Sequence, residues 1–379
     1  MNSSANYDCA IVGGGLGGLC LSIQLAKAGF AVILFEKEKY PFHKVCGEYI
    51  SNESTGFLQG LGVPLSQLSL PQINQLTLSS PSGFTLTASL RTGGFGVSRY
   101  LLDHTLASLA RSAGVRVMEE TKVEAVEFTG DHFIIVAEGE KYAAKIAVGS
   151  FGKRSNLDVK WNRPFIHKTK NSLNNYIAVK YHIQADVTQN NISLHNFENG
   201  YCGISRIENG KTCLCYLTTA DNLKRSGNSI SKMEAEILSV NPHLKKLFSS
   251  AERIYSSPLT ISQISFDKKS CFEDHVLMLG DAAGMITPLC GNGMSMAMHA
   301  SKIAAAEISL FLEGKSDRRK MEERYSKIWR STFSKRLKMG RTIQRFFGKS
   351  SSTEIFIKTM SKLPWLTQRV IRSTHGKPF

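Results

Sequence analysis

The sequence predicts an α/β fold with three parts: a discontinuous domain built on a βαβ unit and a three-stranded β-meander, an inserted and mostly antiparallel β domain, and a C-terminal helical extension. Three observations support this prediction. Residues 8–36 read as strand, glycine turn, helix and strand. Residues 121–148 and 176–218 contain short alternating runs separated by turn residues, as in antiparallel sheets. Residues 315–379 are basic and have helical periodicity.

The glycine turn of the first unit carries a phosphate-binding pattern. Residues 9–12 are apolar, as a buried parallel strand should be, and Gly13, Gly15 and Gly18 then fit Gly-x-Gly-x-x-Gly. The first glycine permits a tight turn, the second lets a pyrophosphate approach the backbone, and the third lets helix and strand pack closely. This turn therefore predicts a Rossmann-like dinucleotide-binding domain.

The elements after the turn fit the same prediction. A helix over residues 16–27 ends before Gly29, a C-terminal capping signal, and a second strand follows over residues 30–35. Glu36 closes this strand and is placed to accept hydrogen bonds from an adenosine ribose. The unit alone leaves open whether the ligand is FAD or NAD.

The rest of the chain is assigned from periodicity and turn signals. The expected elements are an irregular loop over 37–51, a helix from 52 to about 60, a hairpin over 76–88, a helix over 98–113, strands over 121–128, 132–137 and 142–148, strands over 176–183, 192–197, 201–207 and 212–218, a helix over 230–238, a strand over 275–279 and a helix over 293–312. They predict a first domain over 1–73, 98–158 and 271–314, a substrate-binding β-sheet domain over 74–97 and 159–270, and a basic helical extension over 315–379.

Three further signals mark a ligand site. Asp281 follows the strand over 275–279, where its carboxylate can hold a sugar-like polyol, and the turn at 291–293 brings helix N–H groups against a ring that becomes anionic when reduced. Arg99 opens a helix and can neutralise a pyrophosphate. Residues 44–48, Lys-Val-Cys-Gly-Glu, form a polar loop soon after the second strand.

These stretches resemble the flavoprotein group that contains para-hydroxybenzoate-hydroxylase-type monooxygenases, geranylgeranyl reductases and flavin-dependent halogenases. The matching residues are Gly13-x-Gly15-x-x-Gly18 with Glu36, Lys44-x-Cys46-Gly47-Glu48, Arg99-x-x-Leu102-Asp103, and Gly280-Asp281 through Gly293. They are spread over residues 8–312, and their combination is specific for FAD. The resemblance thus implies FAD as the cofactor.

The resemblance also implies roles for individual residues. Glu36 would bind the adenosine ribose, Arg99 and Lys44 would approach the phosphates, Val123 would flank the adenine, Asp281 would hold the ribityl chain, and residues 291–294 would lie at the isoalloxazine. The full set of expected cofactor-binding residues is Gly13, Gly15, Leu16, Gly17, Gly18, Glu36, Lys37, Lys44, Cys46, Gly47, Arg99, Val123, Gly280, Asp281, Pro288, Gly291, Asn292, Gly293 and Met294.

Two departures from the family pattern bear on the chemistry. Phe151 stands where many members carry an acid in a motif linked to FAD and NADPH, although Lys153 and Arg154 could still meet a phosphate. Residues 200–205, Gly-Tyr-Cys-Gly-Ile-Ser, lack the Trp and Pro of the geranylgeranyl reductases, and the halogenases' Trp-x-Trp-x-Ile-Pro is also absent. We therefore expect a wider or differently shaped pocket.

The candidate substrate contacts are His195, Tyr201, Ser205 and Cys290, for a small hydrophobic substrate. The two strand residues His195 and Tyr201 lie on the expected substrate sheet, and Cys290 lies in a flavin loop by resemblance. No side chain is assigned a catalytic role, and no metal-ligand cluster or Ser-His-Asp pattern is found. This is consistent with chemistry carried by a cofactor.

Composition limits the partners. The net charge is +16, and residues 315–349 alone hold thirteen Lys and Arg against three acidic residues. Their apolar positions recur at helical spacing, so this helix either packs on the protein with a solvated basic face, or contacts an anionic membrane or a lipid-bearing carrier. No nucleic-acid recognition pattern accompanies the charge. Eight scattered cysteines and the lack of a signal-peptide pattern predict a cytoplasmic protein, and the basic helix leaves a peripheral place at the membrane open, as it does the oligomeric state.

The preferred function is an NAD(P)H-dependent FAD monooxygenase acting on an aromatic, polyketide or lipid-like molecule. In this interpretation NAD(P)H is the reductant and O₂ supplies the oxygen atom. One alternative is a geranylgeranyl-reductase-like enzyme that reduces or dehydrogenates C–C bonds, favoured by the loop over 44–48. A second, non-enzymatic alternative is a flavin-binding sensor at a membrane.

Overall fold

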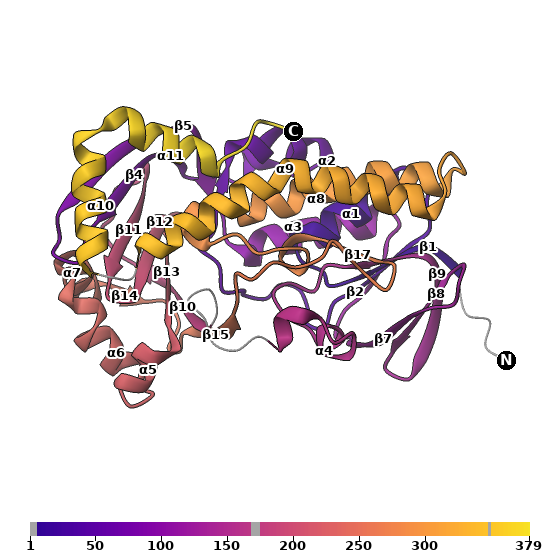
Figure 1. Cartoon of the computed structure of the whole chain (residues 1–379), viewed down its shortest axis with the longest axis horizontal. Coiled ribbons are helices and arrows are strands. Elements are labelled where there is room, and N and C mark those ends of the chain that lie inside the picture. Colours follow the sequence, from indigo (N-terminus) through magenta and orange to yellow (C-terminus); the bar gives the residue numbers. More distant parts are fainter. Residues whose placement is uncertain (1–5, 168–174, 348–349) are drawn as a thin grey trace.

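A computed structural model describes residues 6–167, 175–347 and 350–379 of the 379-residue chain. The strands form two sheets that lie side by side along the longest axis of the molecule, and helices cover both (Figure 1). The first sheet is mostly parallel and the second mostly antiparallel. The predicted α/β class is confirmed.

The first sheet is built on the N-terminal βαβ unit. β1 (Asn6–Val12) lies between β2 (Val32–Phe35) and β9 (Glu140–Gly149), parallel to both. All four residues of β2 are buried, because helices cover one face of the sheet and the meander and loops cover the other. The order is β16-β17-β9-β1-β2-β6, completed by β6 (Arg116–Met118), β16 (Phe272–Glu273) and β17 (Val276–Met278).

A meander and three helices complete this domain. β7 (Val123–Phe128) and β8 (Phe133–Ala137) join β9 as the expected antiparallel meander. α1 (Leu16–Lys27) packs between α3 (Arg99–Ser112) and α8 (Gly293–Leu312), and nine of its twelve residues are buried. Two short helices, α2 (Thr55–Leu61) and α4 (Asn156–Lys160), lie at the periphery.

The second sheet has the order β14-β10-β13-β12-β11-β4-β5-β3, with β15 paired to β10. Its strands are β3 (Tyr49–Ser51), β4 (Gln72–Ser79), β5 (Thr85–Gly96), β10 (Tyr176–Gln184), β11 (Asn191–Phe197), β12 (Gly200–Arg206), β13 (Thr212–Thr219), β14 (Glu252–Arg253) and β15 (Leu259–Ile264). The strands over 176–218 occur within one residue of their predicted limits at each end. β3 differs from expectation, since the end of the 37–51 loop pairs with β5 rather than staying in the first domain.

The two faces of the second sheet have different neighbours. One face packs under α5 (Ala220–Arg225), α6 (Ile230–Glu236) and α7 (Pro242–Ser250), with Tyr181, Tyr216 and Leu244 in its core. The helix predicted over 230–238 ends at Glu236 and leaves α7 unpredicted, although Asn241 caps that helix and Pro242 occupies its first turn. The opposite face carries an apolar cluster that we call the inner apolar cluster: Tyr176, Ala178, Leu194, Tyr201, Leu217, Ile264 and Phe266.

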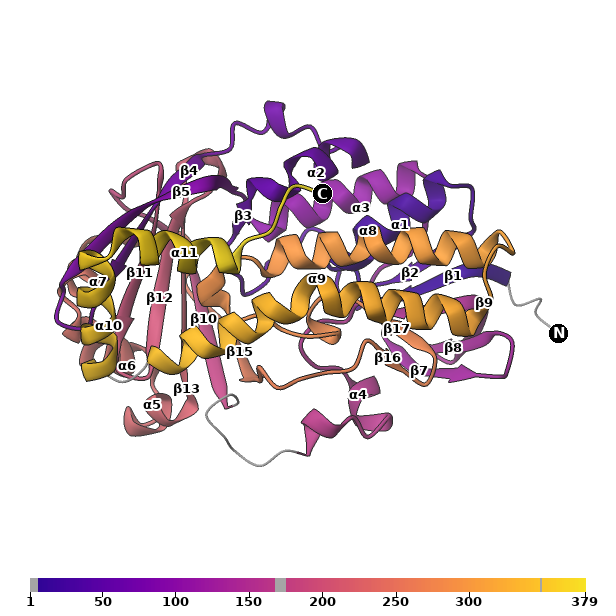
Figure 2. The same ribbon diagram turned by 45° about the horizontal axis from the view of Figure 1, so that its top comes forward.

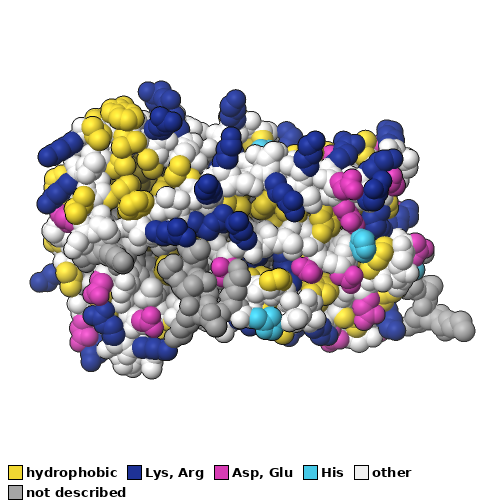
Figure 3. All heavy atoms as spheres, in the orientation of Figure 1, with side chains coloured by type: hydrophobic (Ala, Val, Ile, Leu, Met, Phe, Trp, Pro, Cys, Tyr) yellow, Lys and Arg dark blue, Asp and Glu magenta, His cyan; other side chains and the backbone are white. Residues whose placement is uncertain are grey.

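The C-terminal helices are α9 (Arg318–Phe346), α10 (Ser350–Lys362) and α11 (Pro364–Thr374). α9 runs beside α8 along the length of the molecule (Figure 2). Its apolar side, including Tyr325, Trp329 and Phe333, is buried in the core of the first domain, and the Tyr325 hydroxyl donates to the Met278 carbonyl at 2.8 Å. α9 is therefore an integral part of the first domain, and most of its Lys and Arg side chains lie on the surface (Figure 3).

Within the described ranges, no helix combines the length and the apolar composition that crossing a bilayer requires.

Candidate functional site

The glycine turn between β1 and α1 leaves no room for side chains where it touches the protein. Gly13 has φ +103°, and a Cβ there would lie 2.5 Å from the Ser150 carbonyl oxygen. A Cβ on Gly18 would lie 2.3 Å from the Gly13 oxygen. Gly15, the N-cap of α1, faces open space, since the nearest neighbour of a Cβ there would be Arg99 Nη2 at 3.8 Å. A ligand can therefore approach the first N–H groups of α1 on that side.

Glu36 ends β2 beside this turn. It is buried and accepts hydrogen bonds from the Gly14 N–H at 3.0 Å and the Glu38 N–H at 3.2 Å. Lys44 Nζ lies 3.7 Å from the Glu36 carboxylate. Lys37 is exposed and pairs with Glu38, so it lies at the rim of the site.

Two cations and one buried acid lie next to the turn. Arg99 binds both oxygens of Asp103 at 2.7 Å, and Lys44 Nζ lies 3.1 Å from the same carboxylate. Burial alone would raise the pKa of Asp103, but the Arg99 and Lys44 cations outweigh burial and hold it below its usual range. This cluster keeps Arg99 fixed where a pyrophosphate would need it.

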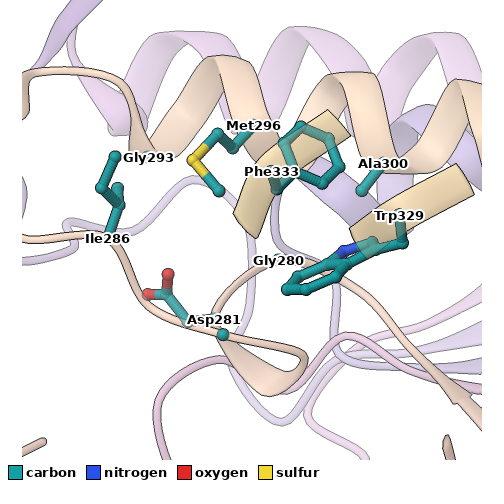
Figure 4. Close-up of a pocket in the computed structure, with 9 residues that line it drawn as sticks. Gly280, Asp281, Ile286, Gly293, Met296, Ala300, Trp329 and Phe333 are labelled. Carbon is teal, nitrogen blue, oxygen red and sulfur yellow. The ribbon is translucent and has the colours of Figure 1, made fainter. Parts of the chain in front are cut away.

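The second half of the site follows β17. Gly280 turns the chain with φ +55°, and the Asp281 carboxyl lines a cavity with Gly293 and Met296 of α8 and with Trp329 and Phe333 of α9 (Figure 4). In this view the Asp281 side chain points to the side of Ile286 and Gly293. Burial raises the pKa of Asp281, and Lys269 and Arg99 partly offset this. Arg99 thus acts on both halves of the site.

Lys269 is the neighbour of Asp281 that the sequence did not indicate. Its Nζ donates to the Asp281 carbonyl at 2.8 Å and to the Lys153 carbonyl at 2.7 Å. Burial lowers the pKa of Lys269 to about 8, although Asp281 opposes the shift. The ammonium therefore contributes positive charge close to the Asp281 loop at neutral pH.

The turn before α8 presents unused donors. A short 3₁₀ turn, η7 (Pro288–Cys290), leads to Gly291 with φ +61°, and Asn292 caps α8. Asn292 is fully buried, and its Nδ2 finds no acceptor among the described residues. A buried amide without an acceptor is costly unless a ligand supplies one. Together with the free N–H groups at the start of α8, it fits the polar edge of a flavin ring.

The remaining cofactor candidates lie around these two halves. Leu16 and Gly17 belong to the first turn of α1, and Val123 begins β7 and is buried beside the first domain's core. Cys46 Sγ lies 3.7 Å from Met294 Sδ, so the 44–48 loop reaches the start of α8. The expected roles of Gly47 and Pro288 stay predictions.

The 44–48 loop ends in a buried ion cluster that sequence reasoning missed. Glu48 is fully buried and accepts from Lys180 Nζ at 2.5 Å, His182 Nε2 at 2.6 Å and the Arg99 N–H at 2.8 Å. Burial would raise the pKa of Glu48, but His182 and Lys180 together lower it. The available signal was the period-two placement of Lys180 and His182 in an otherwise apolar strand. The cluster connects the second sheet to the N-terminus of α3 in the first domain.

Three atoms of this region also have metal-ligand chemistry. The ligating atoms of Glu48, His182 and Cys213 lie within 4.8 Å of one another, a grouping the sequence did not reveal. The Lys180 ammonium already neutralises Glu48 and occupies one of its oxygens. We therefore interpret the group as an ion-pair network.

The structure separates the four substrate candidates. Tyr201 and Ser205 lie on the inner face of β12, and the Ser205 hydroxyl donates to the Gly47 carbonyl at 3.4 Å. Cys290 is buried in η7. It lies close enough to Tyr201 to add, after burial, to the rise in the pKa of the Tyr201 phenol. His195 lies on the opposite, helix-covered face, bound to Ser79 Oγ at 2.8 Å and stacked on His243. The prediction that His195 contacts the substrate does not fit this placement, because strand alternation turns its side chain away.

The loop after β9 differs from the expected reductant motif in its contacts too. Phe151 packs near Trp161, with ring centroids 6.3 Å apart. Arg154 donates to Gln263 Oε1 at 2.6 Å, and Lys153 donates to the Ser262 carbonyl. Both cations thus contact β15, and the expectation that they meet a phosphate stays a prediction.

The fold and these two half-sites define a flavoprotein. A family model described as "FAD binding domain" matches residues 6–337, and the chain belongs to this family of FAD-dependent flavoenzymes.

Among curated relatives, the chain is 26% identical to conditioned medium factor receptor 1 of Dictyostelium discoideum, over 90% of this chain and 70% of that protein. It is 25% identical to the digeranylgeranylglycerophospholipid reductase of Methanocaldococcus jannaschii, over 92% of this chain and 88% of that protein.

Solved structures give the same fold. The flavin-dependent brominase Bmp2 superposes with a TM-score of 0.80 at 20% identity, covering 98% of this chain and 93% of its own. A geranylgeranyl bacteriochlorophyll reductase-like protein from Thermoplasma acidophilum has a TM-score of 0.80 at 18% identity, covering 100% and 97%. At this level of identity the two structures show the fold alone, and the flavoenzyme class rests on the family model.

Proposed function

We propose that the protein is an FAD-dependent monooxygenase that hydroxylates an amphiphilic substrate, one with a phenol-like ring and an apolar chain, and that NAD(P)H is its reductant. The observation that carries this proposal is a pair of buried tyrosines, Tyr49 and Tyr201, next to the turn before α8, whose hydroxyls have no acceptor among the described residues.

The walls around that turn are mostly apolar. The inner apolar cluster on the second sheet packs against Leu289 of η7 and against Met285, which precedes this turn. Gly291 faces the sheet, since the Tyr49 ring lies 3.2 Å from where a Gly291 Cβ would be. A substrate bound between sheet and turn would therefore meet hydrocarbon over most of its surface.

The two tyrosines supply the polar exception. Among the described residues, neither the Tyr49 hydroxyl nor the Tyr201 hydroxyl has a hydrogen-bond partner of good geometry, although the Leu289 backbone lies close to Tyr201. Burial raises the pKa of both phenols, so both stay protonated and can donate. An unpaired buried hydroxyl costs about 1–3 kcal/mol, which a substrate oxygen would recover and a plain hydrocarbon would not.

The protein's own contribution to the reaction is positioning and electrostatics. When bound, FAD would take two electrons from NAD(P)H and activate O₂, so that one oxygen atom enters a C–H bond of the substrate and the other leaves as water. Asp281 and the glycine turn would hold the two ends of the cofactor. The N-terminus of α8 would stabilise negative charge on the reduced ring, and the apolar walls would exclude water.

Reduction of a C=C bond is the second candidate, and Cys46 is the observation that favours it. Its thiol lies next to Met294 at the start of α8, and burial raises its pKa, so it stays protonated. A neutral thiol there could deliver the proton that accompanies hydride transfer to an alkene. The similarity to an archaeal lipid reductase supports the same reaction.

Isotope labelling separates the two candidates. FAD-loaded protein is incubated with NADPH or NADH under ¹⁸O₂ with long-chain alkylphenols, and separately with polyunsaturated isoprenoid lipids, and products are analysed by mass spectrometry. The proposal predicts one ¹⁸O atom in the phenolic product. A product heavier by two hydrogen atoms, formed without O₂ uptake, would instead establish the reductase. Failure of every donor and substrate would favour a sensor.

A matched pair of variants tests the carrying observation. Tyr201→Phe should raise the KM for a phenolic substrate about fivefold, the equivalent of one neutral hydrogen bond. Tyr100→Phe, at an exposed tyrosine, should leave it unchanged. Equal kinetics for wild type and Tyr201→Phe would remove this residue from the substrate site.

A further inference from the structure

The position of α9 revises the expected membrane contact. The apolar side of α9 is buried in the first domain, and of the large hydrophobic residues of this helix only Phe346, the last one, is exposed. Residues 315–345 therefore have no apolar face left for a bilayer, and the other exposed apolar side chains of the C-terminal region follow Phe346 along the chain. We propose that the surface formed by Phe346 at the end of α9, by α10 and α11, and by the β4–β5 hairpin is a docking surface for an anionic lipid bilayer, and that this role is independent of the reaction catalysed.

Large hydrophobic side chains gather on this surface. Of the nine that are exposed in the described part of the chain, four belong to it: Ile355 at 66% exposure, Trp365 at 63%, Phe346 at 45% and Phe84 at 39%. Figure 3 shows hydrophobic side chains grouped over the end of the molecule formed by α10 and α11, with Lys and Arg beside them. Scattered single residues of this kind are ordinary, but a group is not.

Contacts between the helices and the hairpin hold the group together. The Phe346 and Phe356 rings stack with centroids 5.6 Å apart, which joins the end of α9 to α10. Glu354 accepts from Ser82 at 2.8 Å, and Lys358 Nζ lies 5.9 Å from the Phe84 ring centroid, which joins α10 to the hairpin. Thr367 donates to the Met360 carbonyl at 2.8 Å and fixes the turn that presents Trp365. The side chains are therefore held in place before any partner arrives.

The charge of this region matches an anionic surface. From Arg324 to the C-terminus the sequence has fourteen Lys and Arg and one acidic residue, Glu354. That acid is already bound by Ser82 and Lys358. Lys362, Arg369 and Arg372 are exposed on the two helices. Near an anionic leaflet each such cation contributes about 1 kcal/mol, and tryptophan favours the interface between headgroups and acyl chains.

The same helices cover the second sheet. α10 and α11 pack against β5, Gln368 donates to the Ser89 carbonyl at 3.0 Å, and Ile371 packs with Tyr49, Ile73 and Leu90. The proposed docking surface is therefore one helix away from the apolar walls described above. Two amphipathic helices lying in the plane of the interface would bring those walls to the membrane without crossing it.

Vesicle flotation with the full-length, FAD-loaded protein tests the proposal. Vesicles of phosphatidylcholine with about 30% phosphatidylglycerol should float most of the protein at about 0.1 M salt, phosphatidylcholine alone should float little, and about 0.5 M salt should release it. The Lys362→Glu/Arg369→Glu variant should bind anionic vesicles at least tenfold more weakly. The Lys141→Glu/Lys160→Glu variant has the same net charge, with both changes at exposed sites of the first domain, and should bind like wild type.

The apolar part has its own readout. Binding should shift tryptophan emission to the blue in wild type but not in Trp365→Phe, since Trp329 is already buried and Trp161 lies at the end of α4 in the first domain. Trp365→Ser should weaken binding severalfold, whereas Val159→Ser, at another exposed apolar residue, should not. Equal losses in both charge variants, no binding to anionic vesicles, or a concentration-dependent dimer that Trp365→Ser abolishes would each overturn the proposal.

Discussion

Removing the Lys180 ammonium tests how much the buried ion cluster stabilises the fold. Lys180→Met keeps an unbranched apolar chain that is one atom shorter and removes the charge. The Lys180 and Glu48 side chains are 1% and 0% exposed, so water cannot take over the lost interaction. Removing one partner of a buried pair costs about 3–5 kcal/mol. His182 and the Arg99 N–H still bind Glu48, so we expect the lower end, about 3 kcal/mol.

The assay is urea unfolding at pH 7, followed by circular dichroism, with FAD at one fixed concentration because ligand binding adds to apparent stability. Lys145→Met is the matched control. Lys145 pairs with Asp8 at 2.8 Å, but its side chain is 63% exposed, and the loss should stay below about 1 kcal/mol. A Glu48→Gln/Lys180→Met double variant should lose less than the sum of the two single variants. If Lys180→Met and Lys145→Met cost the same, the cluster does not stabilise the fold as we reason.

The pH range follows from the two shifted groups. The pKa of Glu48 is lowered from 4.5, so its contribution is complete above about pH 4.5 and is lost as pH falls through the lower folded value. Glu48 raises the pKa of Lys180 above 10.5 against the effect of burial, so the Lys180 contribution is lost only above that pH. The difference between wild type and Lys180→Met should be constant between these limits.

Three further predictions concern the cofactor site and the second sheet. Asp281→Ala should weaken FAD binding by about tenfold or more in fluorescence titrations, because a hydrogen bond to a charged group is lost. Asp281→Asn should retain more affinity, and full FAD retention in Asp281→Ala would contradict the assigned role. Gly18→Ala should abolish FAD loading, measured as the flavin absorbance of the purified protein, because its Cβ would lie 2.3 Å from the Gly13 oxygen, whereas Gly56→Ala, with no atom within 4 Å, should load normally. Burial and His243 lower the pKa of His195 from 6.5 to about 4, so the unfolded chain binds more protons between these pH values and the free energy of unfolding should decrease as pH falls through them. In urea titrations His195→Gln should reduce the dependence of this free energy on pH. An unchanged dependence would refute the prediction.

The parts of the fold predicted from the sequence are those with local signals. Gly13, Gly18 and Glu36 fit a pattern that spans a few tens of residues, and the structure places them around one turn. The strands over 176–218 were predicted from alternation and turn residues, and the structure buries one face of them under helices while the other face carries the inner apolar cluster. Asp281 was identified from its place at the end of a buried strand, where the chain returns to the glycine turn.

The parts that were missed depend on contacts between distant segments. Glu48 and Lys180 are 132 positions apart, and neither carries a local signal for an ion pair. Alternation places His195 and Tyr201 on strands but does not say which face of the sheet each side chain occupies, and the structure puts His195 on the helix-covered face and Tyr201 on the other. The helical period of α9 was recognised, yet periodicity cannot tell whether an apolar stripe meets its own protein or a membrane. Only the structure shows that the apolar side of α9 meets its own protein, because Trp329 and Phe333 are buried there.

The burial of α9 against the first domain also constrains how the protein is made. The glycine turn and β1 leave the ribosome first, but the core around them is closed by Tyr325, Trp329 and Phe333, near the end of the chain. The second sheet, complete by Ile264, can form while that core is still open. FAD should therefore bind tightly only after α9 has been synthesised. A nascent chain stalled before α9 would contain the glycine turn but not the complete cofactor site.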